Sequence, residues 1–215
     1  MVAVPEMLRM AAKGPTAEDP RGMEQRYLVK FLFNPKGGLL GKSLDGVDRD
    51  LLFEVVRSGL RNEDGHARGA FSSVYANLSL TELKPILPTI HQAILDRSPS
   101  GEMFDGQIQM AGLDLFSRHH VSEGIELTAD YLRLQKPHGS EKRVPELLEM
   151  LKRYGAHAKR AIPGLEKTIH YFEHEEKEHP KDGSLRKAEV VREAIREIRK
   201  MTDKPELRIL GIWVQ

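Results

Sequence analysis

Two histidines four residues apart are the strongest candidates for chemistry in this sequence. His170 and His174 would share one face of a helix, where two imidazoles at this spacing can bind zinc or nickel. The helical metalloprotease signature needs a glutamate directly after the first histidine, and Tyr171 stands there instead. The charged run that ends at His179 favours a solvated helix end. A metal-dependent enzyme or metal-binding protein centred on His170 and His174 therefore stays an alternative. No catalytic residue, metal ligand or cofactor is assigned.

A glycine-rich stretch, Gly37 to Ser43, resembles a phosphate-binding loop. Such a loop needs four residues between its first glycine and its Gly-Lys-Ser, so that successive N–H groups can surround the phosphates. Gly37 and Gly41 enclose only three residues, and Gly46 interrupts the helix that should begin at the lysine. The stretch is therefore interpreted as a flexible glycine loop.

The last expected helix, residues 185–200, is rich in basic side chains and offers a nucleic-acid interface as a further alternative. Glutamates alternate with these lysines and arginines, which is typical of a solvated helix face with ion pairs along it. Aromatic residues make up 6% of the chain, and nothing resembles a base-stacking platform. The pattern favours a polar capping helix, and a nucleic-acid partner is not expected.

An acidic turn, Asn62 to Gly65, precedes His66. A calcium loop would need alternating oxygen ligands and a closing glutamate, which are missing, so an interhelical turn is expected. Near it, Glu54 with Arg57, and Asp64 with Arg68, have the spacing of ion pairs on a helix surface.

The composition limits the class of protein. The chain has 215 residues, of which 40% are hydrophobic and 30% charged, and its net charge is +1. This is enough for one sizeable core, and it excludes collagen-like and bulk-disordered chains. The absence of cysteine excludes disulfides and thiolate chemistry. No apolar run is long enough to cross a membrane. Pro5, Glu6 and Arg9 interrupt the apolar stretch that a signal peptide needs. A cytoplasmic location is therefore expected by default.

Apolar residues recur at helical spacing through most of the chain. Asp48 marks the start of the first clear helix, Ser79 with Glu82 forms a capping-box pattern, and Ser184 caps the last helix. The expected helices cover residues 48–60, 67–78, 80–95, 107–116, 125–134, 144–154, 158–172 and 185–200. Two stretches stay open: residues 26–33 fit a strand or a helix, and residues 207–214 fit a terminal strand or an apolar tail that docks.

Three of these helical stretches form an internal repeat. They cover residues 80–95, 121–134 and 156–172, and they align on Pro88, Gly124 and Pro163 at steps of 36 and 39 residues. A period in this range indicates stacked units of helix, turn and helix, because one helix pair cannot bury both of its apolar stripes. Proline fits the first turn of a helix, where no N–H is needed, or bends a helix from inside.

The segment Tyr154 to Phe172 resembles the second half of a HEAT repeat. Its Gly/Ala-rich turn is followed by the pattern Ala-x-x-Ala-Ile-Pro-x-Leu, which runs from Ala158 to Leu165. The copy with Pro88 matches less well, and the copy at residue 121 matches only in spacing and apolar positions. The resemblance covers residues 48–172, and the chain also looks similar to repeat regions of larger uncharacterised bacterial proteins.

This resemblance implies an all-α fold, a HEAT-like superhelix of about four helix pairs with a capping helix. The expected organisation is an N-terminal segment and linker (1–20), a repeat domain (21–201) and a C-terminal tail (202–215). HEAT repeats usually bind other proteins on their concave face, so a non-catalytic scaffold is expected, with a partner protein or another domain of a longer chain. Helical phase places seven polar candidates on that face: His91, Gln92, Glu126, Asp130, Arg133, Lys167 and His170. Trp213 either seals the end of the stack or anchors a partner.

Overall fold

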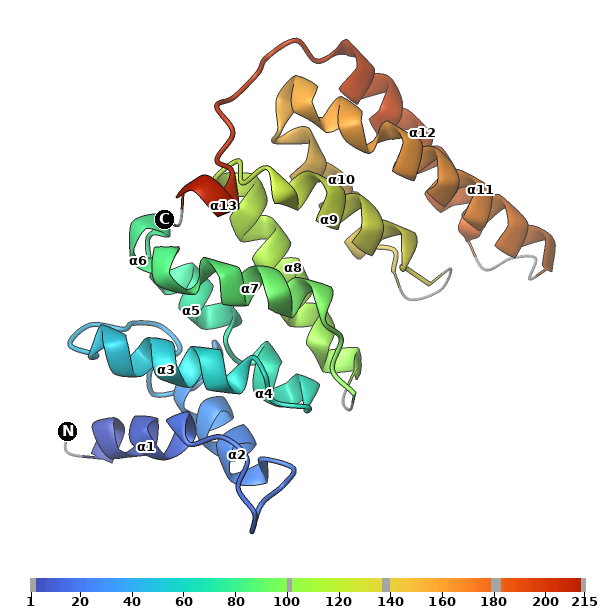
Figure 1. Ribbon diagram of the computed structural model, residues 1–215. Helices are drawn as coiled ribbons and strands as arrows, with labels where there is room; N and C mark the ends of the chain where they lie inside the picture. The colour runs from blue at the N-terminus through green and yellow to red at the C-terminus, as the bar shows by residue number, and fades with distance from the viewer. Residues whose placement is uncertain (1–2, 100–101, 137–139, 179–182, 214–215) are drawn as a thin grey trace. The chain divides into compact units, whose positions relative to one another are not determined.

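The computed structural model describes residues 3–99, 102–136, 140–178 and 183–213. These residues form α-helices joined by short turns and 3₁₀ segments (Figure 1), and an isolated bridge between Val121 and Arg208 is the β-type pairing found among them. The expected all-α class is confirmed. The chain divides into two compact units, Met1–Gly112 and Leu113–Trp213. The expected domain boundaries at residues 20 and 201 stay a prediction.

The first unit is built from helix pairs in two layers. Helix α1 packs on α3, α2 packs on α4, and α1 also contacts α2. The elements are α1 (Ala3–Ala12), α2 (Met23–Phe33), α3 (Arg49–Gly59), α4 (Gly65–Gly69), α5 (Ser72–Asn77), α6 (Leu80–Leu83), the 3₁₀ helix η1 (Lys84–Ile86), α7 (Leu87–Leu95) and the first part of α8 (Glu102–Arg118). The buried side of α3 carries Leu52, Val55 and Val56, as the apolar stripe predicts.

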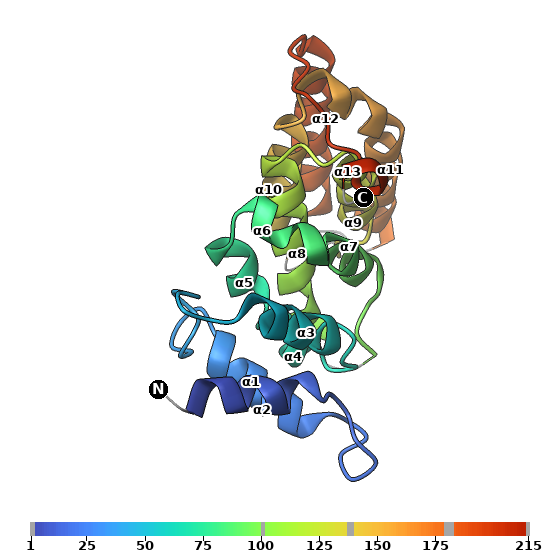
Figure 2. The same ribbon diagram turned by 60° about the vertical axis from the view of Figure 1, so that its left-hand side comes forward.

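The second unit repeats this arrangement. Helix α9 packs on α11 and α10 packs on α12, while α9 also contacts α10 and α11 contacts α12, as Figures 1 and 2 show from two directions. The elements after α8 are α9 (Glu123–Arg133), α10 (Arg143–Lys152), the 3₁₀ helix η2 (Gly155–Ala161), α11 (Ile162–Glu178), α12 (Ser184–Lys200) and α13 (Leu210–Trp213). Its core includes Leu148, Leu165, Phe172 and Ile195.

The repeat seen in the sequence corresponds to the starts of helices. Helices α3, α7, α9 and α11 begin at residues 49, 87, 123 and 162, at steps of 38, 36 and 39 residues. Pro88, Gly124 and Pro163 are each the second residue of their helix. Helices α7 and α11 directly follow 3₁₀ segments, and their prolines lie in the first turn, so they do not bend the interior of the helix.

Local start signals are mostly confirmed. The carboxylate of Asp48 accepts from the backbone of Leu51, and Ser79 and Glu82 form the complete capping box. The prediction for Ser184 is wrong, because Gly183 precedes the helix in the left-handed region at φ 84° and Ser184 is the first, buried residue of α12.

The single helix expected over residues 67–78 is also wrong. The structure splits it into α4 and α5, with Phe71 at the break. The ring of Phe71 is fully buried, and its centroid lies 5.4 Å from that of Phe33. A Cβ atom on Gly59 would lie 2.3 Å from this ring, so a glycine is needed where α3 meets Phe71.

Both open stretches are resolved by the structure. Residues 26–33 are helical, as part of α2. The tail docks on the second unit: the backbone of Ser122 donates to Arg208, that of Arg208 donates to His120, and that of Leu210 donates to Glu123 Oε1. One bridge and the short helix α13 stand where a terminal strand was the other possibility. The side chain of Trp213 lies outside the described residues, so both roles suggested for it stay predictions.

Candidate functional site

Five of the seven candidate binding residues lie in the second unit on two adjacent helices. Glu126, Asp130 and Arg133 are on α9, and Lys167 and His170 are on α11. All five are exposed, and α9 packs against α11 (Figure 1). We call these five residues the α9–α11 face. His91 and Gln92 lie on α7 in the first unit, where His91 is half-buried and Gln92 is exposed.

Small residues allow α9 and α11 to pack closely. A Cβ atom added at Gly164 would lie 3.5 Å from the Cβ of Ala129, which is ordinary contact. On the inner side, Ile125, Leu132 and Leu165 are fully buried. Because the apolar stripes of both helices turn inward, their polar residues are left on the outer side.

Ion pairs across and along this face are long and exposed. Glu126 pairs with Arg160 of η2 at 3.4 Å, Asp130 pairs with Arg133 at 3.4 Å, and His170 Nδ1 lies 3.5 Å from Glu173. Pairs of this kind contribute little to stability, typically about 0–1 kcal/mol. Their charged groups can therefore exchange partners at little cost.

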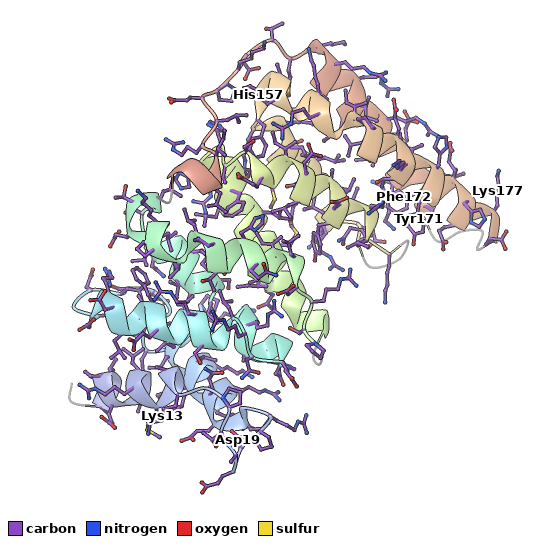
Figure 3. All side chains as sticks on the ribbon, in the orientation of Figure 1. Lys13, Asp19, His157, Tyr171, Phe172 and Lys177 are labelled. Carbon is purple, nitrogen blue, oxygen red and sulfur yellow. The ribbon has the colours of Figure 1, made fainter. Side chains whose placement is uncertain are left out.

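The histidine pair lies in the second half of α11, the stretch of helix in which Figure 3 labels Tyr171, Phe172 and Lys177. His170 and His174 are both exposed, and the side chain of His170 is 80% accessible. Among the residues that the structure describes, no group of three or more metal-binding side chains comes together. His179, the third histidine of the sequence, lies outside those residues.

The basic residues of α12 are largely held in ion pairs. Arg192 bonds with Glu173 and Glu189, and Arg196 also bonds with Glu189. Hydrogen bonds from these two arginines lower the pKa of the Glu189 carboxyl. Arg199 pairs with Glu166 at 2.9 Å, and the buried Lys187 pairs with Glu141 at 3.2 Å. Glutamates therefore offset much of the positive charge on which a nucleic-acid interface depends.

The glycine loop after α2 is a tight hydrogen-bonded turn. The N–H groups of Gly37 and Gly38 donate to the carbonyl of Asn34, and those of Leu39 and Leu40 donate to the last turn of α2. A Cβ atom on Gly41 would lie 2.1 Å from the carbonyl oxygen of Asn34. These amides are already bonded, so they cannot surround a phosphate as the resemblance to a phosphate loop would require.

Two clefts in the first unit bring together residues from several elements, a grouping that the sequence did not predict. One, about 700 Å³, lies between the end of α3 and α7, and Gln92 is in its lining. The other, about 460 Å³, lies between the end of α1 and α3. Arg61 lines both, so the clefts adjoin. We call them the arginine clefts.

The two ion pairs expected beside these clefts are wrong. Arg57 donates to the carbonyl of Pro85 at 3.1 Å rather than to Glu54. Arg68 is buried and donates to the carbonyls of Ala93 and Asp96. Its expected partner Asp64 instead pairs with Arg26 and His66. Helical spacing could not reveal this, because the competing partners come from other helices.

A buried polar network fixes the elements beside the clefts. Gln25 donates to the carbonyl of Ala11 and to Ser58, and Asn62 donates to Gln25. Asn62 in turn accepts from the backbone of Asp64. The chain segments that end α1 and α3 and begin α2 and α4 are thereby joined through satisfied hydrogen bonds.

No helix within the described ranges is both long enough and apolar enough to span a membrane.

Comparisons with protein-family models, with curated proteins and with solved structures found no match to this chain.

Proposed function

We propose that this chain is a HEAT-like α-solenoid of about four helix pairs with a capping helix, and that it is a non-catalytic scaffold. Its α9–α11 face in the second unit binds a partner protein or another domain of a longer chain, and His91 and Gln92 of α7 are candidate contacts within the first unit. The repeated helix starts support the solenoid, because steps of 36 to 39 residues are in the range typical of stacked helix pairs. The layered packing within each unit supports it too, since like helices stack on like helices.

One observation carries the binding role. Five polar residues chosen by helical phase alone are all exposed on two adjacent helices whose apolar stripes are buried. The face offers acidic, basic and imidazole groups, and the ion pairs found for them in the described part of the chain are 3.4 to 3.5 Å long. Such a surface suits a polar protein interface, whose charges give specificity and faster association.

Affinity capture with a surface variant tests this proposal. The purified chain and its variant Glu126→Lys/Asp130→Lys/Lys167→Glu/His170→Glu are used as baits in native lysate at low and moderate salt. We expect the original chain to capture one protein in stoichiometric amount and the variant to lose it. Metal content is measured on the same purified sample.

The matched control is Glu146→Lys/Glu193→Lys, which reverses exposed charges on the other layer, on α10 and α12. This control should keep the partner. Equal loss in both variants, or capture unaffected by the face variant, would contradict the proposed face. Zinc or nickel bound in stoichiometric amount would instead support the alternative at His170 and His174.

A further inference from the structure

The arginine clefts of the first unit are lined by several cationic side chains. Arg57 lies in the last turn of α3 and lines the smaller cleft, and Arg61 lies in the turn after α3 and lines both clefts. Within the described parts of the chain, no ion pair joins either arginine to a carboxylate, whereas Arg192, Arg196 and Arg199 of α12 are all paired.

The walls of the clefts are held in place by contacts that leave donors available. Arg57 uses one N–H group on the carbonyl of Pro85, out of the five that a guanidinium carries. Buried Arg68 ties α4 to the end of α7 through the carbonyls of Ala93 and Asp96. Lys13, which follows α1 (Figure 3), adds a further cation to the lining. A ligand with carboxylates would thus meet preformed donors.

The remaining lining residues favour a peptide over a nucleic acid. Glu54, Glu63 and Asp96 also line the clefts, and they would repel an evenly charged phosphate backbone. No aromatic residue is present in either lining, so there is no surface on which bases could stack. Leu95 is 52% exposed at the edge, where it can contact an apolar side chain. A polypeptide can place its carboxylates opposite the arginines and its neutral residues elsewhere.

We infer that the arginine clefts bind an acidic peptide segment, whose carboxylates bond to Arg57 and Arg61. This inference rests on the proposed scaffold function and names the chemistry of the partner segment that reaches the first unit. It concerns residues outside the α9–α11 face, so the two proposals can fail separately.

Fluorescence polarisation with a labelled oligo-glutamate peptide, in which alanine alternates with glutamate, tests the inference on the full chain. We expect binding at about 50 mM salt that weakens at about 150 mM, as screening requires. The variant Arg57→Gln/Arg61→Gln should weaken binding about tenfold. The charge-preserving variant Arg57→Lys/Arg61→Lys should keep part of it, because lysine retains the charge but not the fork of donors.

The control variant Arg186→Gln/Lys200→Gln removes two exposed cations from α12 and should bind the peptide within about twofold of the original chain. Equal loss in both glutamine variants, or no binding of oligo-glutamate up to about 100 µM, would overturn the inference. Tighter binding of a single-stranded oligonucleotide of equal charge would also overturn it. Circular dichroism of each variant confirms that the helices are retained. If oligo-glutamate binds but no protein is captured from lysate, the result supports the inference about the arginine clefts and contradicts the proposed scaffold function.

Discussion

One copy of the repeat has a glycine where the other two copies have a proline, because neighbouring side chains fill the space. Gly124 aligns with Pro88 and Pro163, but a Cβ atom there would lie 2.1 Å from the hydroxyl of Tyr154 and 2.9 Å from the Cβ of Phe116. Tyr154 is buried and donates to the carbonyl of Val121. This tyrosine leaves no space for any side chain at position 124.

Replacing Gly124 by alanine should therefore destabilise the protein. We expect Gly124→Ala to lower the free energy of unfolding by about 1–3 kcal/mol through overpacking. Gly164→Ala is the control, since its Cβ would make only ordinary contact with Ala129, and helix propensity favours alanine by about 1 kcal/mol. Denaturant unfolding measures both, and equal stability of the two variants would refute this account of Gly124.

Tyr154 also predicts an alkaline limit to stability. Burial raises the pKa of its phenol above the usual range, because the charged form is poorly solvated in the core. The folded pKa thus exceeds the unfolded one, so this contribution is full below about pH 10 and is lost as the pH rises above it. At neutral pH the free energy of unfolding of Tyr154→Phe should be about 1 kcal/mol lower, because the variant lacks the hydrogen bond to Val121.

The same variant should lose less stability than the original chain between about pH 10 and pH 11.5, because it has no phenol to ionise. Urea unfolding across this range compares the two proteins. Parallel curves would show that the phenol of Tyr154 has the same pKa in the folded and the unfolded chain, which would contradict the effect of burial.

At the scale of single residues, the helix starts that depend on one or two neighbouring side chains could be predicted from the sequence. The roles of Asp48, Ser79 and Glu82 follow from spacing alone, and the structure confirms them. The partners of Arg57 and Arg68 could not be predicted, because they are carbonyl groups of α7 and η1 that only tertiary packing brings close.

Among the elements, the C-terminal segment after α12 has a specific role in the second unit. The backbone of Ala156 donates to Asp203, and His157 Nε2 lies 3.1 Å from the carbonyl of Pro205 (Figure 3). Gly155 has φ 56°, and a Cβ atom on it would lie 2.5 Å from the carbonyl oxygen of Asp203. The segment therefore satisfies amides at the start of η2 and before α9 that would otherwise lack backbone partners.

Removing residues 202–215 should expose these amides. We expect faster hydrogen exchange at Ser122 and Ala156, whose N–H groups lose their acceptors, while protection in α10 is kept. Exchange followed by mass spectrometry measures this in the truncated chain. The variant Lys204→Ala, which alters only an exposed side chain, should behave like the original. Unchanged exchange at Ser122 and Ala156, or a uniform loss over the whole second unit, would contradict the docking role.

Element periodicity was predictable, but element breaks were not. The alignment on Pro88, Gly124 and Pro163 places all three at the same position of a helix. The break at Phe71 depends on contact with Phe33 and Gly59, which no local pattern contains. The 3₁₀ start of residues 155–161 was missed for the same reason, since it accompanies the contacts of Gly155 with Asp203.

For the molecule as a whole, the sequence predicts a class of surface more readily than a partner. Helical phase was sufficient to predict that the residues of the α9–α11 face are exposed, because buried stripes fix which side of each helix points outward. The arginine clefts were missed because they combine residues from α1, α3 and α7. The net charge of +1 gives no sign of these clefts, because it sums the charges of the whole chain. It does not show which cations have a carboxylate partner and which do not.

Site-specific photo-crosslinking tests the scaffold proposal most directly. A photo-reactive residue is placed at Lys167 on α11 or, as the control, at Glu146 on α10, and both are exposed positions. The proposal predicts one defined adduct, with a single protein or a segment of the parent chain, from position 167 and none from position 146. Identical adducts at both positions, or no adduct at position 167, would contradict a binding role for the α9–α11 face.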